Sequence, residues 1–175
     1  MTTDPFAQGD LFDPTRIAWI WDADNLDTLI REIHRHPFIT FDVEGTGLDE
    51  HATEGGPTNG GVAARVTLLQ LTLAKSLDDL DPVTWLVPLS HKGASLFPQW
   101  VAILRRCAQA LLDSGADLTG HNGRFDCRWI FAATGVDLTP HLSWDTMVVE
   151  HLLDENTTTK LKIRASRRFG VDRWD

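Results

Sequence analysis

Short apolar stretches rich in β-branched residues recur along the chain and predict strands, because such side chains pack well on a pleated, half-buried surface. These stretches cover residues 17–21, 38–43, 66–73, 84–89 and 117–120. Apolar residues at helical spacing predict helices at 24–34, 99–112, 121–133, 146–153 and 156–169. The Asp24–Asp27 segment is the predicted cap of the first helix.

The order of these elements indicates the fold class. Three strands in a row favour an antiparallel meander, whereas the later elements alternate between strand and helix. The pattern therefore predicts one α/β domain over residues 16–175, with a mixed sheet flanked by helices, after an irregular segment at 1–15.

Composition narrows the class of protein. The chain has 175 residues, of which 42% are hydrophobic, enough for a single soluble domain with a real core. The sequence has no run of 18 apolar residues and no signal-peptide pattern at its start, so it predicts a cytoplasmic protein without a membrane segment. Its two cysteines, Cys107 and Cys127, are predicted to be buried free thiols of a reducing compartment.

Charge is unevenly placed along the chain. The net charge of −9 argues against general nucleic-acid affinity. Residues 160–175 nevertheless hold six basic and two acidic side chains. A basic stripe in the last helix is predicted either to face solvent or to contact nucleic acid or a partner chain; it comprises Lys160, Arg164, Arg167 and Arg168.

Two carboxylates follow one another on the second predicted strand. Alternate side chains of a strand share a face, so Asp42 and Glu44 point the same way, about 7 Å apart. Like charges at that distance repel unless a cation lies between them. Oxygen-only ligands suit magnesium or manganese, so the pair predicts a hard-metal site.

A second acidic signal follows the strand at 117–120. The segment Gly120–Asp126 reads Gly-His-Asn-Gly-Arg-Phe-Asp, with Asn122 as the predicted helix cap. Asn122 and Asp126 are four residues apart, so they are predicted to share a helical face that meets the Asp42 and Glu44 edge. The plainer interpretation is that both residues only cap and solubilise the helix. The histidines lack zinc spacing and are predicted to lie on the surface or in the core, His121 included.

Taken in order, these motifs resemble those of the DEDD 3′–5′ exonucleases. Phe41–Leu48, read as FDVEGTGL, resembles the first exonuclease motif, and His121–Asp126, read as HNGRFD, resembles the second. The stretches 144–147 and 151–156 resemble the following part of the proofreading domain of family A DNA polymerases. The resemblance implies a ribonuclease H-like fold, a two-ion Mg²⁺ or Mn²⁺ site, and single-stranded DNA hydrolysed from its 3′ end in a bacterial or phage-infected cell.

The resemblance also implies roles for single residues. Asp42, Glu44 and Asp126 would be the catalytic metal ligands, and Asp145 a supporting residue that caps the next helix. The terminal nucleotide would be contacted by Thr46, Leu48, Asn122 and Phe125.

The chain departs from the family at the fourth carboxylate. The polymerase branch uses Tyr-x-x-x-Asp, but the chain contains no tyrosine. The other branch uses a histidine five residues before an aspartate, and the residue five after His151 is Asn156. Three explanations compete: a separate polymerase chain or a second protomer supplies the acid, the domain is a cut or degenerate form, or Asp172 or Asp175 substitutes.

This departure leaves three functional hypotheses open. The first is an exonuclease of a DNA proofreading system, which on its own binds metal but cleaves slowly or not at all. The second is a catalytically impaired module that binds a polymerase chain or nucleic acid. The third is a ribonuclease D-like enzyme that trims RNA, which would be distinguished by recognition of the 2′-hydroxyl.

Overall fold

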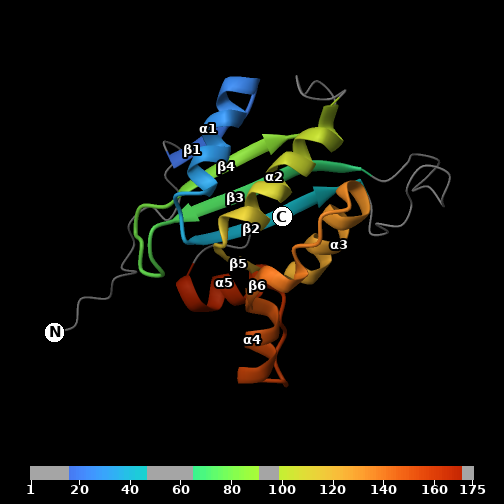
Figure 1. The fold of residues 1–175 in the computed structure, drawn as a ribbon. Helices are drawn as coiled ribbons and strands as arrows, with labels where there is room; N and C mark the ends of the chain where they lie inside the picture. The colour runs from blue at the N-terminus through green and yellow to red at the C-terminus, as the bar shows by residue number, and fades with distance from the viewer. Residues whose placement is uncertain (1–15, 47–64, 91–98, 171–175) are drawn as a thin grey trace.

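The computed structural model describes residues 16–46, 65–90 and 99–170, which form a six-stranded sheet with helices around it (Figure 1). The strands lie in the order β1-β4-β3-β2-β5-β6. Their bounds are β1 Ile17–Trp19, β2 Phe38–Gly45, β3 Val66–Ala74, β4 Val83–Pro88, β5 Asp117–Gly120 and β6 Leu142–Asp145. The helices are α1 Ala23–Ile33, α2 Trp100–Ser114, α3 Gly123–Thr134, α4 Thr146–Leu153 and α5 Leu161–Phe169.

The strand directions confirm the predicted mixed sheet. β2, β3 and β4 form the antiparallel meander, whereas β5 and β6 join β2 in parallel, and β1 lies parallel to β4 at the opposite edge. The centre of the sheet is therefore β2, flanked by an antiparallel neighbour on one side and a parallel neighbour on the other. This is the strand that carries Asp42 and Glu44.

One face of the sheet is covered by helices, with α1 and α2 in front of it in Figure 1 and α3 packed against β2. Strand alternation turns Ile39, Phe41 and Val43 into this core, where each is buried. The same alternation turns Asp42 and Glu44 to the opposite face, where both are exposed. The acidic pair thus stands on the face that α1, α2 and α3 leave uncovered.

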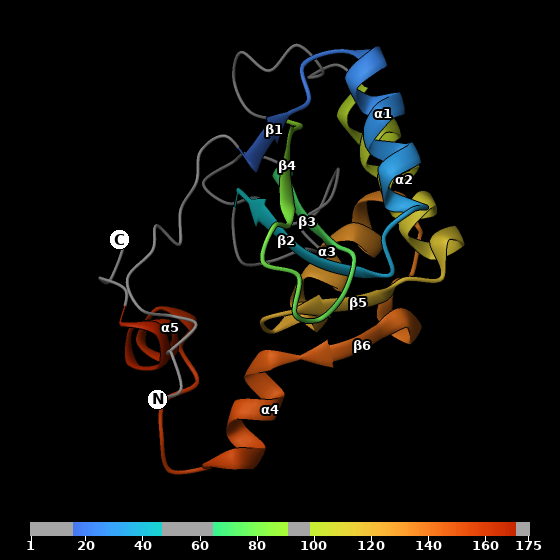
Figure 2. The ribbon, with the colours of Figure 1, turned by 90° about the vertical axis from the view of Figure 1, so that its left-hand side faces the viewer.

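The last two helices form an arm beyond β6. Figure 2 shows α4 continuing from β6 and α5 returning toward the uncovered face of the sheet. An ion-pair cluster joins the two helices: the Glu150 carboxylate of α4 lies 2.9 Å from the Arg164 guanidinium and 2.6 Å from that of Arg168. The solvated interpretation of the basic stripe is therefore wrong for Arg164, whose side chain is only 15% exposed.

Local hydrogen bonds move two predicted helix starts. The cap of α1 is Asp22, whose carboxylate accepts from the Asn25 amide, and not the Asp24–Asp27 segment. The last helix begins at Leu161 rather than Asn156, because Asp154 and Thr158 accept bonds from amides two residues ahead and hold the chain in turns.

In the described residues Cys107 and Cys127 are buried and free, as predicted, and no helix is long and apolar enough to cross a membrane.

Glutamine in place of Glu150 is expected to loosen α5 while the sheet stays folded. The change removes the negative charge shared by two guanidinium groups, one of them nearly buried, and breaking such ion pairs costs several kcal/mol. Amide hydrogen exchange over 161–169 should accelerate at least about tenfold, the equivalent of 1.4 kcal/mol. Exchange in β2 and β3 serves as the internal control, and equal acceleration there would mean that the cluster stabilises the whole domain.

Candidate active site

Asp126 contacts the strand that carries Asp42 and Glu44 at the point where β2 and β5 separate. The parallel ladder between these strands ends at the pair Thr40 and Thr119, so the amide of Val43 lies beyond the end of β5 pairing. The Asp126 carboxylate accepts a hydrogen bond from this Val43 amide at 3.0 Å. Asp126 therefore lies against the main chain between Asp42 and Glu44, rather than facing away from them.

The turn between β5 and α3 brings Asp126 to this position. A methyl group on Gly120 would lie 2.8 Å from the Gly123 Cα, so strand and helix meet without space for a side chain. Asn122, between them, adopts a left-handed conformation with φ 62°, which asparagine tolerates better than most residues. The first turn of α3 thereby starts directly above the strand end.

Loss of hydration and mutual repulsion raise the pKa of two of these acids. Asp126 is 3% exposed, and loss of hydration is the main cause that raises its pKa to about 7. The negative charges of Asp42 and Asp145 add to this rise, whereas the Val43 amide opposes it. Partial loss of hydration and the charge of Glu44 likewise raise the pKa of Asp42, although its side chain is exposed, while His121 lowers it. Acids in this condition favour a bound cation.

A cleft of about 800 Å³ opens in front of Asp42 and Glu44. Its floor is the uncovered sheet face, where Gln70 of β3 donates a 3.2 Å hydrogen bond to the Asp42 carboxylate. Its other wall is the start of α5, with Lys160 and Lys162. The remaining lining residues are Thr40, Phe41, His121, Leu161 and Ile163.

Asp145 links β6 to the turn that precedes α3. Its carboxylate accepts from the amides of Met147 and Val148, and so caps α4 as predicted. The same oxygen accepts from the Asn122 amide at 2.9 Å. Asn122 occupies the N-cap position of α3, as predicted, but its side chain makes no capping bond. Asn122 is exposed whereas Asp126 is buried, so the two residues do not share a helical face as predicted.

The other predicted substrate residues lie around the site in different ways. Thr46 exchanges hydrogen bonds with Arg65, its amide donating to the Arg65 carbonyl and its hydroxyl accepting from the Arg65 amide. Phe125 packs against Trp129 with ring centroids 6.3 Å apart. Leu48 lies outside the described residues. Trp129 also fills the space over Gly45, where a methyl group would meet its ring at 3.1 Å.

His121 lines the cleft, a placement that sequence reasoning missed because no spacing pattern marks it. Its Nδ1 lies 2.9 Å from the Thr146 hydroxyl, which itself donates to the Gly120 carbonyl. The Thr146 hydroxyl therefore positions the imidazole beside Asp42.

The donor chemistry fits a hard divalent cation, since all three acids offer only oxygen atoms. Within residues 16–46, 65–90 and 99–170, however, no three histidine, cysteine, aspartate or glutamate side chains gather closely enough to hold an ion. Two features still favour a cation: the buried Asp126 carboxylate, and the repulsion that raises the pKa of Asp42.

Comparisons with known proteins identify the fold class. No family model matches the sequence, and no curated protein does. Among solved structures, the chain is similar to the Aedes aegypti Nibbler EXO domain, with a TM-score of 0.62 and 14% identity over 95% of this chain and 74% of that one. Escherichia coli RNase D, an exoribonuclease involved in structured RNA processing, matches with a TM-score of 0.56 and 16% identity.

The second of these matches covers 91% of this chain but 34% of RNase D, so the chain spans about a third of that protein. A third similar structure is S. pombe Pop2p in its Mg²⁺ and Mn²⁺ bound form, with a TM-score of 0.52 and 12% identity over 91% of this chain and 84% of that one. The mixed sheet and its helices thus have the ribonuclease H-like fold of exonuclease domains, as the sequence predicted.

Proposed function

We propose that the chain is a metal-dependent nuclease that hydrolyses single-stranded nucleic acid from its 3′ end. The observation that carries this proposal is the bond from the Val43 amide to Asp126, which joins the second acidic motif to the main chain of the first. Mg²⁺ or Mn²⁺ at these acids would supply an activated water and neutralise charge on the phosphate. The metal-bound form of the similar Pop2p fold supports this choice of ions.

The residues of the chain have separable tasks in this proposal. Asp42 and Glu44 face the cleft and would hold the ions on its side, while Asp126 would hold them from the β5 edge of the strand. Because the described acids do not converge closely enough, binding would draw their carboxylates together. Asp145 would keep the β5–α3 turn in place through the Asn122 amide.

Two substrates are consistent with this chemistry. Single-stranded DNA in a proofreading system is supported by the sequence resemblance, with a separate polymerase chain or a second protomer as the partner that completes the acids. RNA is supported by the similar folds, since RNase D is an exoribonuclease. Slow activity is expected of the chain alone with either substrate, because three acids would have to hold two ions and the facing wall offers lysines.

The proposal is tested with 5′-labelled single-stranded DNA and RNA of one sequence, incubated with Mn²⁺. A ladder of products shortened from the 3′ end is expected. The rate of shortening should be slow, but at least about 100-fold higher than with the Asp42→Asn variant. Calorimetry should show Mn²⁺ binding to the unaltered protein and its loss in the variant. Absence of both Mn²⁺ binding and trimming would overturn the proposal, and the faster of the two ladders identifies the substrate.

A further inference from the structure

The wall of the cleft opposite the acids is basic. Lys160 and Lys162 line it at the start of α5, and both side chains are exposed. Asp42 and Glu44 line the floor on the other side. A cleft of about 800 Å³ thus has two carboxylates on one side and two ammonium groups on the other.

These opposite charges do not neutralise one another directly. In the described part of the chain, neither lysine forms an ion pair within 4 Å, and Asp42 bonds to the amide group of Gln70 instead. Direct contact would satisfy all four groups at once and close the cleft. Its walls remain apart, so the cleft suits a ligand that presents cations to one side and anions to the other.

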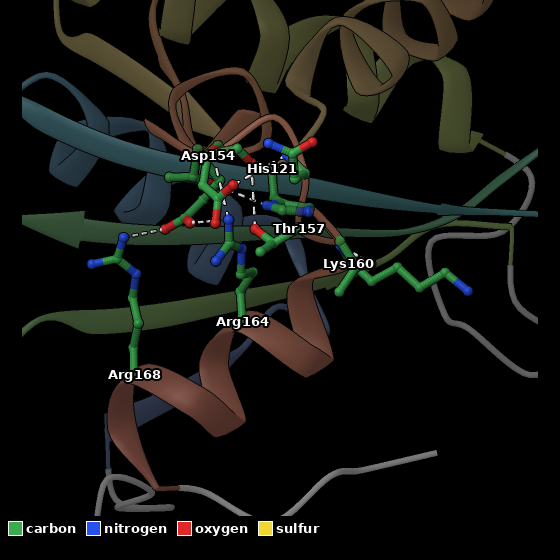
Figure 3. A network of polar contacts seen from close by, with 10 residues as sticks. His121, Asp154, Thr157, Lys160, Arg164 and Arg168 are labelled. Carbon is green, nitrogen blue, oxygen red and sulfur yellow. Dashed lines mark hydrogen bonds and ion pairs between the residues drawn. The ribbon is translucent and has the colours of Figure 1, made fainter. Parts of the chain in front are cut away.

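The ion-pair cluster of the arm fixes which residues of α5 face the cleft. Glu150 holds Arg164 and Arg168 one turn apart on the α4 side of the helix. Figure 3 shows Arg164 and Arg168 directed into this network and Lys160 extended away from it. The basic stripe predicted from the sequence is thereby divided, with Arg164 and Arg168 used to anchor the helix and Lys160 left for the cleft.

We propose that Lys160 and Lys162 bind the phosphates of a single-stranded nucleic acid whose terminal phosphodiester lies at Asp42 and Glu44. This rests on the proposed function, because divalent ions at the acids and phosphates at the lysines together match the two walls. A lysine ammonium is a compact point charge that contacts phosphate without reading the base. The contact is therefore independent of sequence and serves DNA and RNA alike.

The test compares the unaltered 175-residue protein with the double variant Lys160→Gln/Lys162→Gln. Fluorescence anisotropy follows a labelled single-stranded oligonucleotide, with Ca²⁺ in place of Mn²⁺ to keep the strand intact. Two lost phosphate contacts should lower the slope of log affinity against log salt by about 1.4, and weaken binding about tenfold near physiological salt. The variant Lys75→Gln, an exposed lysine outside the cleft, removes one charge elsewhere and should bind normally.

Unchanged affinity and salt slope in the double variant would overturn the proposal, and so would an equal loss per charge in Lys75→Gln. Melting temperatures of all three proteins should agree closely, because both cleft lysines are on the surface. Mn²⁺ calorimetry separates this proposal from the proposed function. If the double variant binds the oligonucleotide more weakly, the phosphate contact is supported, even where Mn²⁺ does not bind the protein. If the double variant binds the oligonucleotide normally, the phosphate contact is overturned, even where Mn²⁺ does bind.

Discussion

Asparagine in place of Asp126 is expected to stabilise the metal-free protein and to weaken Mn²⁺ binding at least ~100-fold. Loss of a residue that only supports a metal ligand costs less than this, so the size of the effect identifies Asp126 as a direct ligand. The amide oxygen of asparagine can still accept the Val43 bond, while the buried charge disappears. The raised pKa of Asp126 makes that charge costly at neutral pH. A gain of about 1–2 kcal/mol, or roughly 4 °C in melting temperature, is expected.

The pH dependence of this gain follows from the direction of the pKa shift. The pKa of Asp126 rises from 3.8 to about 7 on folding, so between these values the unfolded chain releases its proton first and stability falls as pH rises. The advantage of Asp126→Asn should therefore grow from about pH 4 and level off above about pH 7. Thermal unfolding with chelator at several pH values measures it. A constant difference at every pH would contradict the burial of this charge, and the exposed Asp78→Asn variant should show no difference.

Alanine in place of Gly120 is expected to damage both stability and metal binding. The added methyl group would meet the Gly123 Cα at 2.8 Å, and because this atom belongs to the main chain, the start of α3 must shift. Overpacking of this kind costs about 1–3 kcal/mol. Since the first turn of α3 holds Asp126, the Mn²⁺ affinity should fall together with the melting temperature.

The matched control for this substitution is Gly115→Ala, at the end of α2. Gly115 has φ 67° and nothing within 4 Å of an added methyl group, so only left-handed strain of about 1 kcal/mol is expected. Calorimetry of the two variants at a temperature where both are folded distinguishes them. If Gly120→Ala binds Mn²⁺ as well as Gly115→Ala does, the close approach of β5 and α3 is not what places Asp126.

The features that the sequence predicts well are those fixed by local periodicity. Strand alternation places Asp42 and Glu44 on one face whatever the rest of the fold does. The strand β6 at Leu142–Asp145 is not predicted, because the apolar–polar alternation of Leu-Ser-Trp-Asp covers only four residues and the strand depends on pairing with β5. The same holds for Asn122, whose left-handed conformation is imposed by the tight turn.

Contacts between distant residues explain the remaining differences. The ladder between β2 and β5 ends early, and only this register frees the Val43 amide for Asp126. The spacing of Glu150 and Arg164 carries no local signal either, yet their pairing decides which basic side chains reach the cleft. A charge stripe on one helix cannot reveal which of its members another helix has already bound.

The bond between Asp126 and the amide of Val43 also governs where Asp126 lies. An aspartate held by a side chain would change position with every substitution of its neighbour, but this one is held by the polypeptide backbone. Exchange of Val43 for another apolar residue would leave the donor where it is. The position of Asp126 relative to the backbone of the central strand therefore does not depend on which apolar side chain occupies position 43.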